Sequence, residues 1–476
     1  MNFLSLTFLA FFSITLLLYY LLPKGAQNAL LLGANCVFYL WAGPAAGAYL
    51  LGVILLCWAC ALAMERWGRR RLWLSVGVVS LFAALFLFKY LDPATRAIFT
   101  LLDRTGPSPF EQFLPLGVSF YSFSLAGYLF DVYRSKCGVE RNLLRFAAYT
   151  AFFPSVLSGP INRARELLPQ LCQPRRFDLE GFKAGLWRFL CGVAKKLVPA
   201  NILAELIDPA YAAPWDYGSG AWILVACAYS LYIYLDFSAY SDLAVGTAKM
   251  LGLTLPENFR APYLSRSVKE FWKKWHISLT SWFREYLYFP LGGSRKGATR
   301  TCLNVLVVFA VSGLWHGAGL TFLIWGLLNG LYQVVGMWTL SVRKRVRAAL
   351  HIPEDAWYAA AFQGLLTFGL ITISWIFFRA SSIYDALFIL KRILLIVRDG
   401  PGLVRLPFPM LEQVVLYLSL ALVLAEDVLI TRGTSFRIQR TSFRFWITAA
   451  LLASAALLFG LYGPDFQVQD FTYFNF

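Results

Sequence analysis

The chain has 476 residues, of which 59% are hydrophobic and 14% are charged, against about 25% charged in an ordinary soluble domain. This composition excludes an ordinary soluble enzyme, and a β-barrel is excluded because its strands would alternate in period two. The net charge of +17 fits basic cytoplasmic loops better than a nucleic-acid interface, since Lys and Arg mark the inner side of membrane proteins.

Apolar segments of membrane-spanning length follow one another along the chain. A hydrocarbon core about 30 Å thick needs about 20 apolar residues per helix. We therefore predict an all-α polytopic membrane protein, one domain over residues 1–476, with roughly ten to twelve transmembrane or re-entrant helices. The segments are 3–22, 27–42, 44–63, 72–91, 181–200, 221–236, 302–341 (two passes), 358–378, 410–430 and 444–463, with shorter or re-entrant pieces at 113–130 and 146–160.

Four basic clusters, at 65–71, 134–141, 343–347 and 431–440, predict the orientation in the membrane. The first apolar run has no basic n-region and no small-residue cleavage site after it, so it is interpreted as a retained span rather than a signal peptide. Placing all four clusters on the inner side of a cell inner membrane gives a self-consistent topology, with both termini extracytoplasmic.

The cysteines and histidines do not form a metal-binding pattern. Cys57 and Cys60 form a C-x-x-C, but there is neither a second pair nor a nearby histidine. Zinc or redox sites need more ligands than this. We expect ordinary buried thiols, no metal and no bound cofactor.

Residues 254–300 depart from plain spanning helices. Aromatic and leucine side chains recur there at helical spacing, with lysines between them, which predicts an amphipathic helix at the cytoplasmic interface or a re-entrant segment. An interfacial anchor without chemistry explains the pattern equally well, whereas His276 within it favours a functional role. The recurring residues are Phe271, Trp272, Trp275, Leu279, Trp282, Phe283 and Tyr286.

His316 ends an apolar run that begins at Leu303, in the stretch S-G-L-W-H-G-A-G. An ionisable group inside a membrane span is by default a functional hypothesis. A neutral imidazole offers one donor and one acceptor and serves as a general base near neutral pH. The alternative is a structural hydrogen bond between helices. G-x-x-x-G occurs at 313–317 and again at 326–330, a spacing that lets helices approach closely.

Two further groups of polar residues have weaker claims to chemistry. Asp236 and Asp242 end an apolar run in Y-I-Y-L-D-F-S-A-Y-S-D, and a helix-end polar network explains them better than direct catalysis. The loop L-G-G-S-R-K-G contains Arg295 and Lys296 beside glycines. It lacks the full phosphate-binding loop pattern, so an ordinary basic loop is the preferred interpretation.

Several motifs point to one known family. They are L-P-L-G-V-S-F-Y-S-F (114–123), F-F-P-S-V-L-S-G-P-I (152–161), L-D-F-S-A-Y-S-D-L-A (235–244), P-E-N-F-R-A-P-Y (256–263), F-W-K-K-W-H-I-S-L-T-S-W-F-R-E-Y-L-Y-F-P-L-G-G-S-R (271–295), S-G-L-W-H-G-A-G (312–319) and the ending F-T-Y-F-N-F. Together they resemble the membrane-bound O-acyltransferase (MBOAT) family, most closely its bacterial branch that acetylates alginate, peptidoglycan, cellulose and other exopolysaccharides.

This resemblance implies tilted helices around a thin central region, with an outer funnel and an inner tunnel. It also implies that His316 is the essential catalytic residue and that His276 is the second family histidine. The third histidine, His351, matches no motif and is predicted to be a solvated loop residue. Residues expected to line the donor site or tunnel are Trp315, Asp236, Asn258, Lys273, Lys274, Arg295 and Lys296.

The function implied by the resemblance is transfer of an acyl group, most simply acetyl, from a cytoplasmic thioester for O-acetylation of an extracytoplasmic polysaccharide. The donor would be acetyl-CoA or an acyl carrier protein. The partner would be an extracytoplasmic SGNH-type O-acetyltransferase, because the chain has no sizeable outer domain to hold a polymer. Two alternatives stay open: D-alanyl transfer to teichoic acid, and a transporter of donor or polysaccharide without chemistry.

The C-terminal tail, residues 465–476, is predicted to emerge on the outer face. It ends with four aromatic residues in six and carries no basic group, although chain ends are usually polar and loose. It is interpreted either as an aromatic interface anchor or as an acyl relay. In the second case the Tyr473 hydroxyl would accept the acyl group at His316 and present it to the partner.

Overall fold

The computed structural model describes residues 1–23, 25–102, 104, 115–353, 355–401, 406–434 and 443–462. Within these ranges the regular structure is helical and contains no β-strand, which confirms the all-α class. The chain forms two compact units. In the described part of the chain, the first comprises residues 1–193 and 240–257, and the second comprises residues 194–239 and the residues from Asn258 to Tyr462. A single domain over the whole chain stays a prediction.

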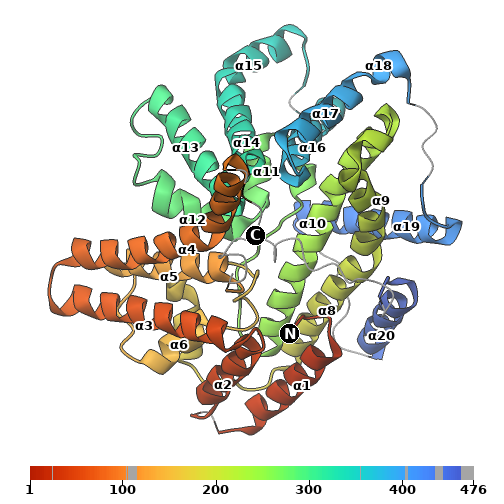
Figure 1. Ribbon diagram of the computed structural model, residues 1–476. Coiled ribbons are helices and arrows are strands. Elements are labelled where there is room, and N and C mark those ends of the chain that lie inside the picture. The colour runs from red at the N-terminus through yellow and green to blue at the C-terminus, as the bar shows by residue number, and fades with distance from the viewer. Residues whose placement is uncertain are drawn as a thin grey trace. The chain divides into compact units, whose positions relative to one another are not determined.

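The first unit contains two long antiparallel helices, α3 and α4, which lie side by side, with α5 next to α4 (Figure 1). Gly43 precedes α3, and Pro44 occupies its first turn, where the missing N–H is not needed. The helices of this unit are α1 (Leu6–Leu21), α2 (Gln27–Leu40), α3 (Pro44–Arg66), α4 (Arg70–Leu101), α5 (Val118–Tyr133), α6 (Leu143–Thr150), α7 (Ala164–Leu171) and α8 (Leu179–Lys195).

The two basic clusters of the first unit lie at the same end of it. The Arg70 guanidinium donates hydrogen bonds to the Val132 carbonyl and the Ser135 hydroxyl. Arg141 forms an ion pair with Glu65 at 3.2 Å. The turn after α3 and the loop after α5 therefore share one side of the unit.

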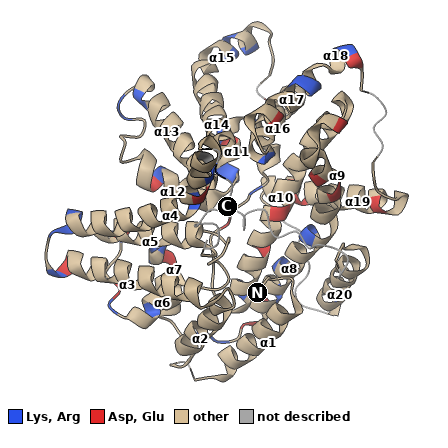
Figure 2. Ribbon diagram, viewed as in Figure 1, with Lys and Arg blue, Asp and Glu red and all other residues tan. Residues whose placement is uncertain are grey.

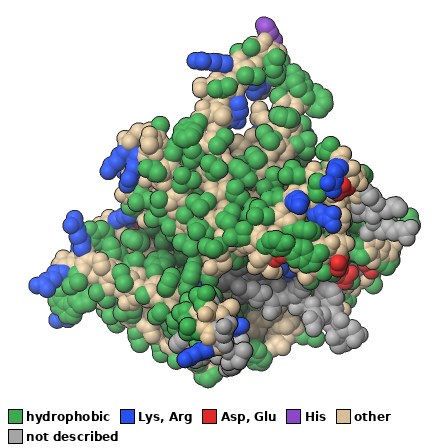
Figure 3. Space-filling view, turned by 45° about the horizontal axis from the view of Figure 1, so that its top comes forward, with side chains coloured by type: hydrophobic (Ala, Val, Ile, Leu, Met, Phe, Trp, Pro, Cys, Tyr) green, Lys and Arg blue, Asp and Glu red, His purple; other side chains and the backbone are tan. Residues whose placement is uncertain are grey.

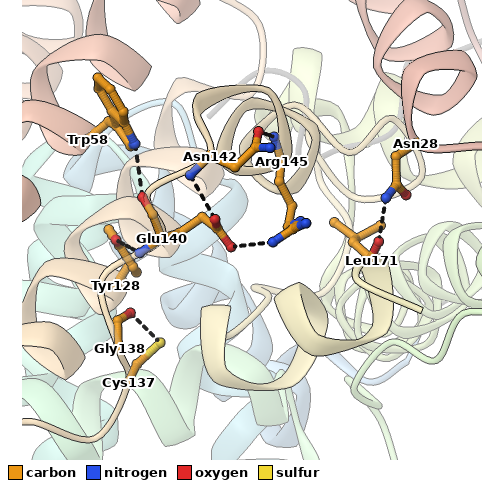
Figure 4. Close-up of polar contacts among 9 residues, drawn as sticks. All are labelled: Asn28, Trp58, Tyr128, Cys137, Gly138, Glu140, Asn142, Arg145 and Leu171. Carbon is orange, nitrogen blue, oxygen red and sulfur yellow. Dashed lines mark hydrogen bonds and ion pairs between the residues drawn. The ribbon is translucent and has the colours of Figure 1, made fainter. Parts of the chain in front are cut away.

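Glu140 fastens the loop after α5 to its surroundings (Figure 4). Its carbonyl accepts from the Trp58 indole at 2.9 Å, and its N–H donates to the Tyr128 hydroxyl at 3.0 Å. Its carboxylate accepts from the Asn142 N–H at 2.9 Å and pairs with Arg145 at 3.5 Å. One acidic residue thus ties a basic loop to α3, α5 and the start of α6.

The second unit is built around the antiparallel pair α13 and α14, with α16 packed along α14 (Figure 1). The last part of α10, from Tyr240, belongs to the first unit. The elements are η1 (a π-helix, Lys196–Ala200), α9 (Asn201–Ala212), η2 (Pro214–Asp216), α10 (Ser219–Met250), η3 (Pro262–Leu264), α11 (Val268–Lys274), α12 (Ile277–Phe283), η4 (a π-helix, Arg284–Tyr288), α13 (Ala298–His316), α14 (Leu320–Trp338), α15 (Leu340–Ala349), α16 (Trp357–Arg379), α17 (Ile383–Leu394), α18 (Ile396–Asp399), α19 (Met410–Thr431) and α20 (Phe443–Phe459).

Seven helices in the described part of the chain are long and apolar enough to cross a membrane: α3, α4, α10, α13, α14, α16 and α19. The shorter apolar helices α1 and α20 accompany them. Lys and Arg gather at helix ends and turns, for example between α3 and α4 (Figure 2). Hydrophobic side chains cover most of the visible surface (Figure 3). The protein is therefore a multi-pass helical membrane protein.

The 254–300 segment differs from the single amphipathic helix that its periodicity predicts. It forms two seven-residue helices, α11 and α12, separated by Trp275 and His276. His276 adopts the left-handed backbone conformation, with φ 42°, which no continuous α-helix allows. All seven recurring apolar side chains are buried in the protein. They form part of the core of the second unit, so the expectation of an aromatic surface anchor is wrong for them.

Candidate active site

Close packing of α13 against α14 positions His316. A Cβ atom on Gly313 would lie 2.4 Å from the Phe322 carbonyl oxygen, and one on Gly326 would lie 2.3 Å from the Phe309 carbonyl oxygen. Only glycine permits this approach of two backbones, so the prediction from the G-x-x-x-G spacing is confirmed. His316 is the last residue of α13 and its side chain is 2% exposed.

Aromatic rings surround the His316 imidazole. Its centroid lies 4.6 Å from the Trp315 ring, 4.9 Å from the Trp325 ring and 5.2 Å from the Phe378 ring. The Trp375 ring stacks on that of Trp325, with 5.6 Å between the centroids. The rings from α14 and α16 were not predicted. They occur in W-G-L-L-N-G and W-I-F-F-R, which by sequence alone are indistinguishable from ordinary apolar helix.

His276 lies in the same aromatic cluster. The Phe237 ring of α10 meets its imidazole edge to face at 4.7 Å, and the Trp315 ring lies 6.4 Å away. Because Trp315 is also 4.6 Å from His316, the two imidazole centroids are no farther apart than the sum of these two distances. The structure thus brings together His276, Trp315 and His316, which sequence reasoning had named separately.

Asn258 holds the backbone around His276. Its carbonyl accepts the Ile277 N–H at 2.9 Å, and its side-chain oxygen accepts the Ser278 hydroxyl at 2.6 Å. The Arg260 N–H donates to the Lys274 carbonyl at 3.0 Å. A left-handed non-glycine residue costs about 1–3 kcal/mol and persists only where its surroundings enforce it. Asn258 is itself buried and holds the backbone on both sides of His276 in place; its place in the lining of a donor site or tunnel stays a prediction.

The two histidines differ in electrostatic setting. Burial lowers the pKa of His276 to about 3 from the ordinary 6.5, so this imidazole is neutral at pH 7. His316 occupies the C-terminal end of a 19-residue helix, where the partial negative charge of the helix dipole stabilises a cation. His276 lies instead between α11 and α12, outside the end of a long helix.

The acidic residues of α10 form ion pairs. Asp236 accepts from the Lys196 ammonium at 2.7 Å, and both side chains are fully buried. In the first unit, Arg188 pairs with Asp242 and, at 2.6 Å, with Glu257. Burial alone would lower the pKa of Arg188, but the two carboxylates raise it. The two aspartates thus belong to polar pairs, but they lie within α10 rather than at its end as predicted. Their basic partners were missed because they lie on distant segments.

The remaining candidates lie outside the aromatic cluster. Lys273, Arg295 and Lys296 are exposed, and Lys274 pairs with Glu270 at 2.8 Å. They offer positive charge at the surface of the second unit and do not touch either buried histidine ring.

Three further expectations concern residues away from the site. His351 is exposed after α15, as predicted. Cys57 and Cys60 are buried free thiols on α3, also as predicted. Within the described ranges, no group of three His, Cys, Asp or Glu side chains is arranged to hold a metal ion. Tyr473 lies outside the described residues.

The structure is thus a polytopic helical membrane protein with two buried histidines in one aromatic cluster. Comparison with known proteins identifies the class. The sequence profile described as MBOAT, membrane-bound O-acyltransferase family, matches residues 112–383. The chain belongs to this family and is a membrane-bound O-acyltransferase.

Three relatives indicate the branch. The chain is 37% identical over 383 residues to a probable alginate O-acetylase AlgI of Pseudomonas putida, covering 79% of this chain and 76% of that protein. It is 30% identical over 419 residues to a peptidoglycan O-acetyltransferase of Helicobacter pylori, and the match covers 80% of this chain and 77% of that protein. It is 27% identical over 228 residues to a teichoic acid D-alanyltransferase of Bacillus subtilis, and the match covers 45% of this chain and 57% of that protein.

Proposed function

We propose that the protein takes an acetyl group from a cytoplasmic thioester and transfers it within the membrane for O-acetylation of an extracytoplasmic polysaccharide. The observation that carries this proposal is the shared burial of His276 and His316 around Trp315. The two O-acetylating relatives match about four fifths of the chain, whereas two D-alanylating relatives match 45% and 55% of it. This difference favours acetyl over D-alanyl as the transferred group.

In this proposal His316 is the general base. Its imidazole removes the proton of an acceptor hydroxyl as the oxygen attacks the thioester carbonyl. The helix dipole of α13 stabilises the imidazolium that forms. Water is kept out by the rings of Trp315, Trp325 and Phe378. His276 stays neutral and, from its fixed backbone position, helps to place donor or acceptor on the other side of Trp315.

The donor side of the proposal uses the exposed basic residues of the second unit. Acetyl-CoA and acyl carrier proteins are both anionic, and positive charge near the entrance raises the rate of encounter. Lys273, Arg295 and Lys296 are exposed and supply that charge. Increasing ionic strength should therefore raise the KM for the donor with little change in kcat.

Turnover of radiolabelled acetyl-CoA by purified protein in lipid nanodiscs tests the base assignment. His316→Ala should abolish release of CoA and transfer of label, and His276→Ala should lower both. His351→Ala is the matched control, since it removes an exposed histidine outside the site. Normal transfer by a folded His316→Ala protein would refute the assignment. Vesicle uptake of donor without bond cleavage would favour the transporter alternative.

The partner and the tail complete the proposal. The protein alone should not acetylate polymer, and an extracytoplasmic SGNH-type O-acetyltransferase should restore that activity. The Tyr473 hydroxyl, deprotonated by His316, would take the acetyl group from the thioester and present it to the partner's nucleophile as an aryl ester. Tyr473→Phe keeps the aromatic ring and removes only the hydroxyl. Polymer acetylation at the normal rate by Tyr473→Phe with the partner present would leave the tail as an anchor only.

The proposed location is the bacterial inner membrane, with both termini outside. The basic clusters after α3 and after α5 then face the cytoplasm, in line with their common position on the first unit. Reporter fusions at either end test this: a periplasmic reporter should be active and a cytoplasmic reporter inactive. The reverse result would invert the topology and, with it, the donor side.

A further inference from the structure

Trp325 carries a hydrogen-bond donor beside the catalytic histidine that the described structure does not use. Its side chain is 1% exposed, and its indole N–H has no acceptor among the described residues. Two indoles that pack against its ring are satisfied: Trp272 donates to Asn329 at 3.1 Å, and Trp375 donates to Tyr263 at 3.2 Å. A buried donor without an acceptor costs about 1–3 kcal/mol, so such a group in an active site is a candidate for binding a substrate oxygen.

The Trp325 ring is held rigidly. It stacks on Trp375 at an interplanar angle of 21°, and it meets Phe378 at 5.0 Å and Trp272 at 5.7 Å. Its backbone carbonyl accepts from the Asn329 side chain at 2.9 Å. A donor fixed in this way needs no reorganisation when negative charge appears in front of it, which is the property that makes an oxyanion site effective.

The Trp325 ring also has the right distance from the base. Its centroid lies 4.9 Å from that of His316, and the planes are nearly perpendicular at 86°. Acyl transfer needs a point about 3 Å from both the nucleophile and the oxyanion donor. Rings this close allow the imidazole to hold the attacking hydroxyl while the indole N–H reaches the carbonyl oxygen of the same tetrahedral centre.

From this geometry we propose that the Trp325 N–H is an oxyanion donor of the acyl transfer. The proposal rests on the function proposed above. His316 takes the proton of the acceptor hydroxyl as the new C–O bond forms, and the carbonyl electron pair moves onto oxygen. The Trp325 N–H donates to that oxyanion. The carbonyl then re-forms, the C–S bond breaks, and the departing thiolate takes the proton from His316.

Two replacements of Trp325 test the role of the N–H. Trp325→Phe removes the N–H together with one ring. Incorporation of benzothienylalanine at position 325 replaces only the N–H by sulfur and keeps the size and stacking of the side chain. Loss of one oxyanion donor lowers kcat about 100- to 1,000-fold in other acyl-transfer enzymes. We expect a fall of that order with both replacements, with an unchanged dissociation constant for a non-cleavable ketone analogue of acetyl-CoA.

The pH dependence and a control variant separate catalysis from packing. The acid limb of kcat should keep its position in the Trp325 variants, because His316 still acts as the base. Trp222→Phe is the matched control: Trp222 is fully buried on α10, donates to the Pro214 carbonyl at 3.2 Å and packs on Tyr211, outside the site. Its kcat should stay near that of the wild-type protein.

Activity of the benzothienylalanine protein within a few fold of wild type would overturn the proposal, and that replacement decides the matter if Trp325→Phe does not fold. Weaker binding of the ketone analogue without loss of kcat would also overturn it, because the ring would then only shape the site. Failure of the proposed function would be seen in the wild-type protein, as lack of acetyl-CoA cleavage. The Trp325 variants would then be compared on the thioester that the wild-type protein does cleave.

Discussion

Removing the carboxylate of Asp236 should destabilise the protein far more than removing Asp236 and Lys196 together. The two groups form an ion pair at 2.7 Å, and both are fully buried. Asp236→Leu leaves an ammonium group in a fully buried site, and Lys196→Met leaves a carboxylate there. The double variant leaves neither charge and fills the space with apolar atoms.

The structure sets the size of the effect. Breaking a fully buried pair by removing one partner costs about 3–5 kcal/mol, whereas replacing both partners by apolar groups is often neutral or stabilising. Each single variant should therefore lose about 3–5 kcal/mol of unfolding free energy, and the double variant should recover most of it. The coupling energy of the cycle would then be several kcal/mol.

Reversible unfolding in mixed micelles of dodecyl maltoside and SDS, followed by tryptophan fluorescence, measures these free energies. The exposed pair of Arg141 and Glu65 is the matched control, and its cycle should give a coupling of about 0–1 kcal/mol. Additive losses in the buried cycle, or a loss below about 1 kcal/mol for Asp236→Leu, would refute the reasoning. In that case the charges would not determine the packing of α10 against η1.

Three further predictions concern the site. Gly313→Ala places a methyl group 2.4 Å from a backbone oxygen and should cost about 1–3 kcal/mol of stability and most of the activity. The control Gly336→Ala, whose methyl group would meet nothing within 4 Å, should be neutral or stabilising by up to about 1 kcal/mol. Equal melting temperatures and transfer rates for the two variants would contradict this prediction. Because the pKa of His276 is about 3 in the folded protein and 6.5 in the unfolded chain, this group should not affect stability above pH 6.5, and below it stability should fall by about 1.4 kcal/mol per pH unit. Between pH 7 and 5 the melting temperature should therefore depend less steeply on pH in His276→Gln than in the wild-type protein. An unchanged pH dependence would exclude His276 as the cause. Asn258→Ala frees the backbone at His276 and should lower kcat about 10- to 100-fold. Adding Asn258→Ala to His276→Ala should cause no further loss of kcat. Fully additive losses in steady-state kinetics would show that Asn258 acts elsewhere.

The spanning helices were predictable because a helix that faces lipid is apolar on most sides. Segments 44–63, 358–378 and 410–430 correspond to α3, α16 and α19 within a few residues. Segment 221–236 was too short: α10 continues to Met250. The two aspartates did not end the helix, because Lys196 and Arg188 neutralise them from 40 and 54 residues away. Hydropathy along the chain does not contain that information.

The site was predictable only in its polar members. Motif resemblance singled out His276, His316 and Trp315, and the structure brings their rings together. The helical period across Trp275 and His276 was misleading, because a left-handed histidine enforced by Asn258 has no sequence signature. The Trp325 ring and its unused N–H also depend on tertiary packing. Aromatic residues in a membrane protein are too common for their roles to be inferred from composition.

The opposite settings of the two histidines argue for a division of labour in the transfer. His316 ends a helix of five turns, where the dipole stabilises the imidazolium that a base must become. His276 is buried against Phe237, and its pKa is about 3. Protonation of His276 in each catalytic cycle would therefore be unfavourable at pH 7. In the proposed acyl transfer a single imidazole that gains and loses a proton is sufficient, because the proton that it takes from the acceptor hydroxyl is passed on to the leaving thiolate. A second charged imidazole, no farther away than two ring-to-ring contacts through Trp315, would destabilise the first by like-charge repulsion. In the proposed mechanism His276 would therefore contribute as a neutral group of fixed orientation, held by the left-handed backbone that Asn258 supports.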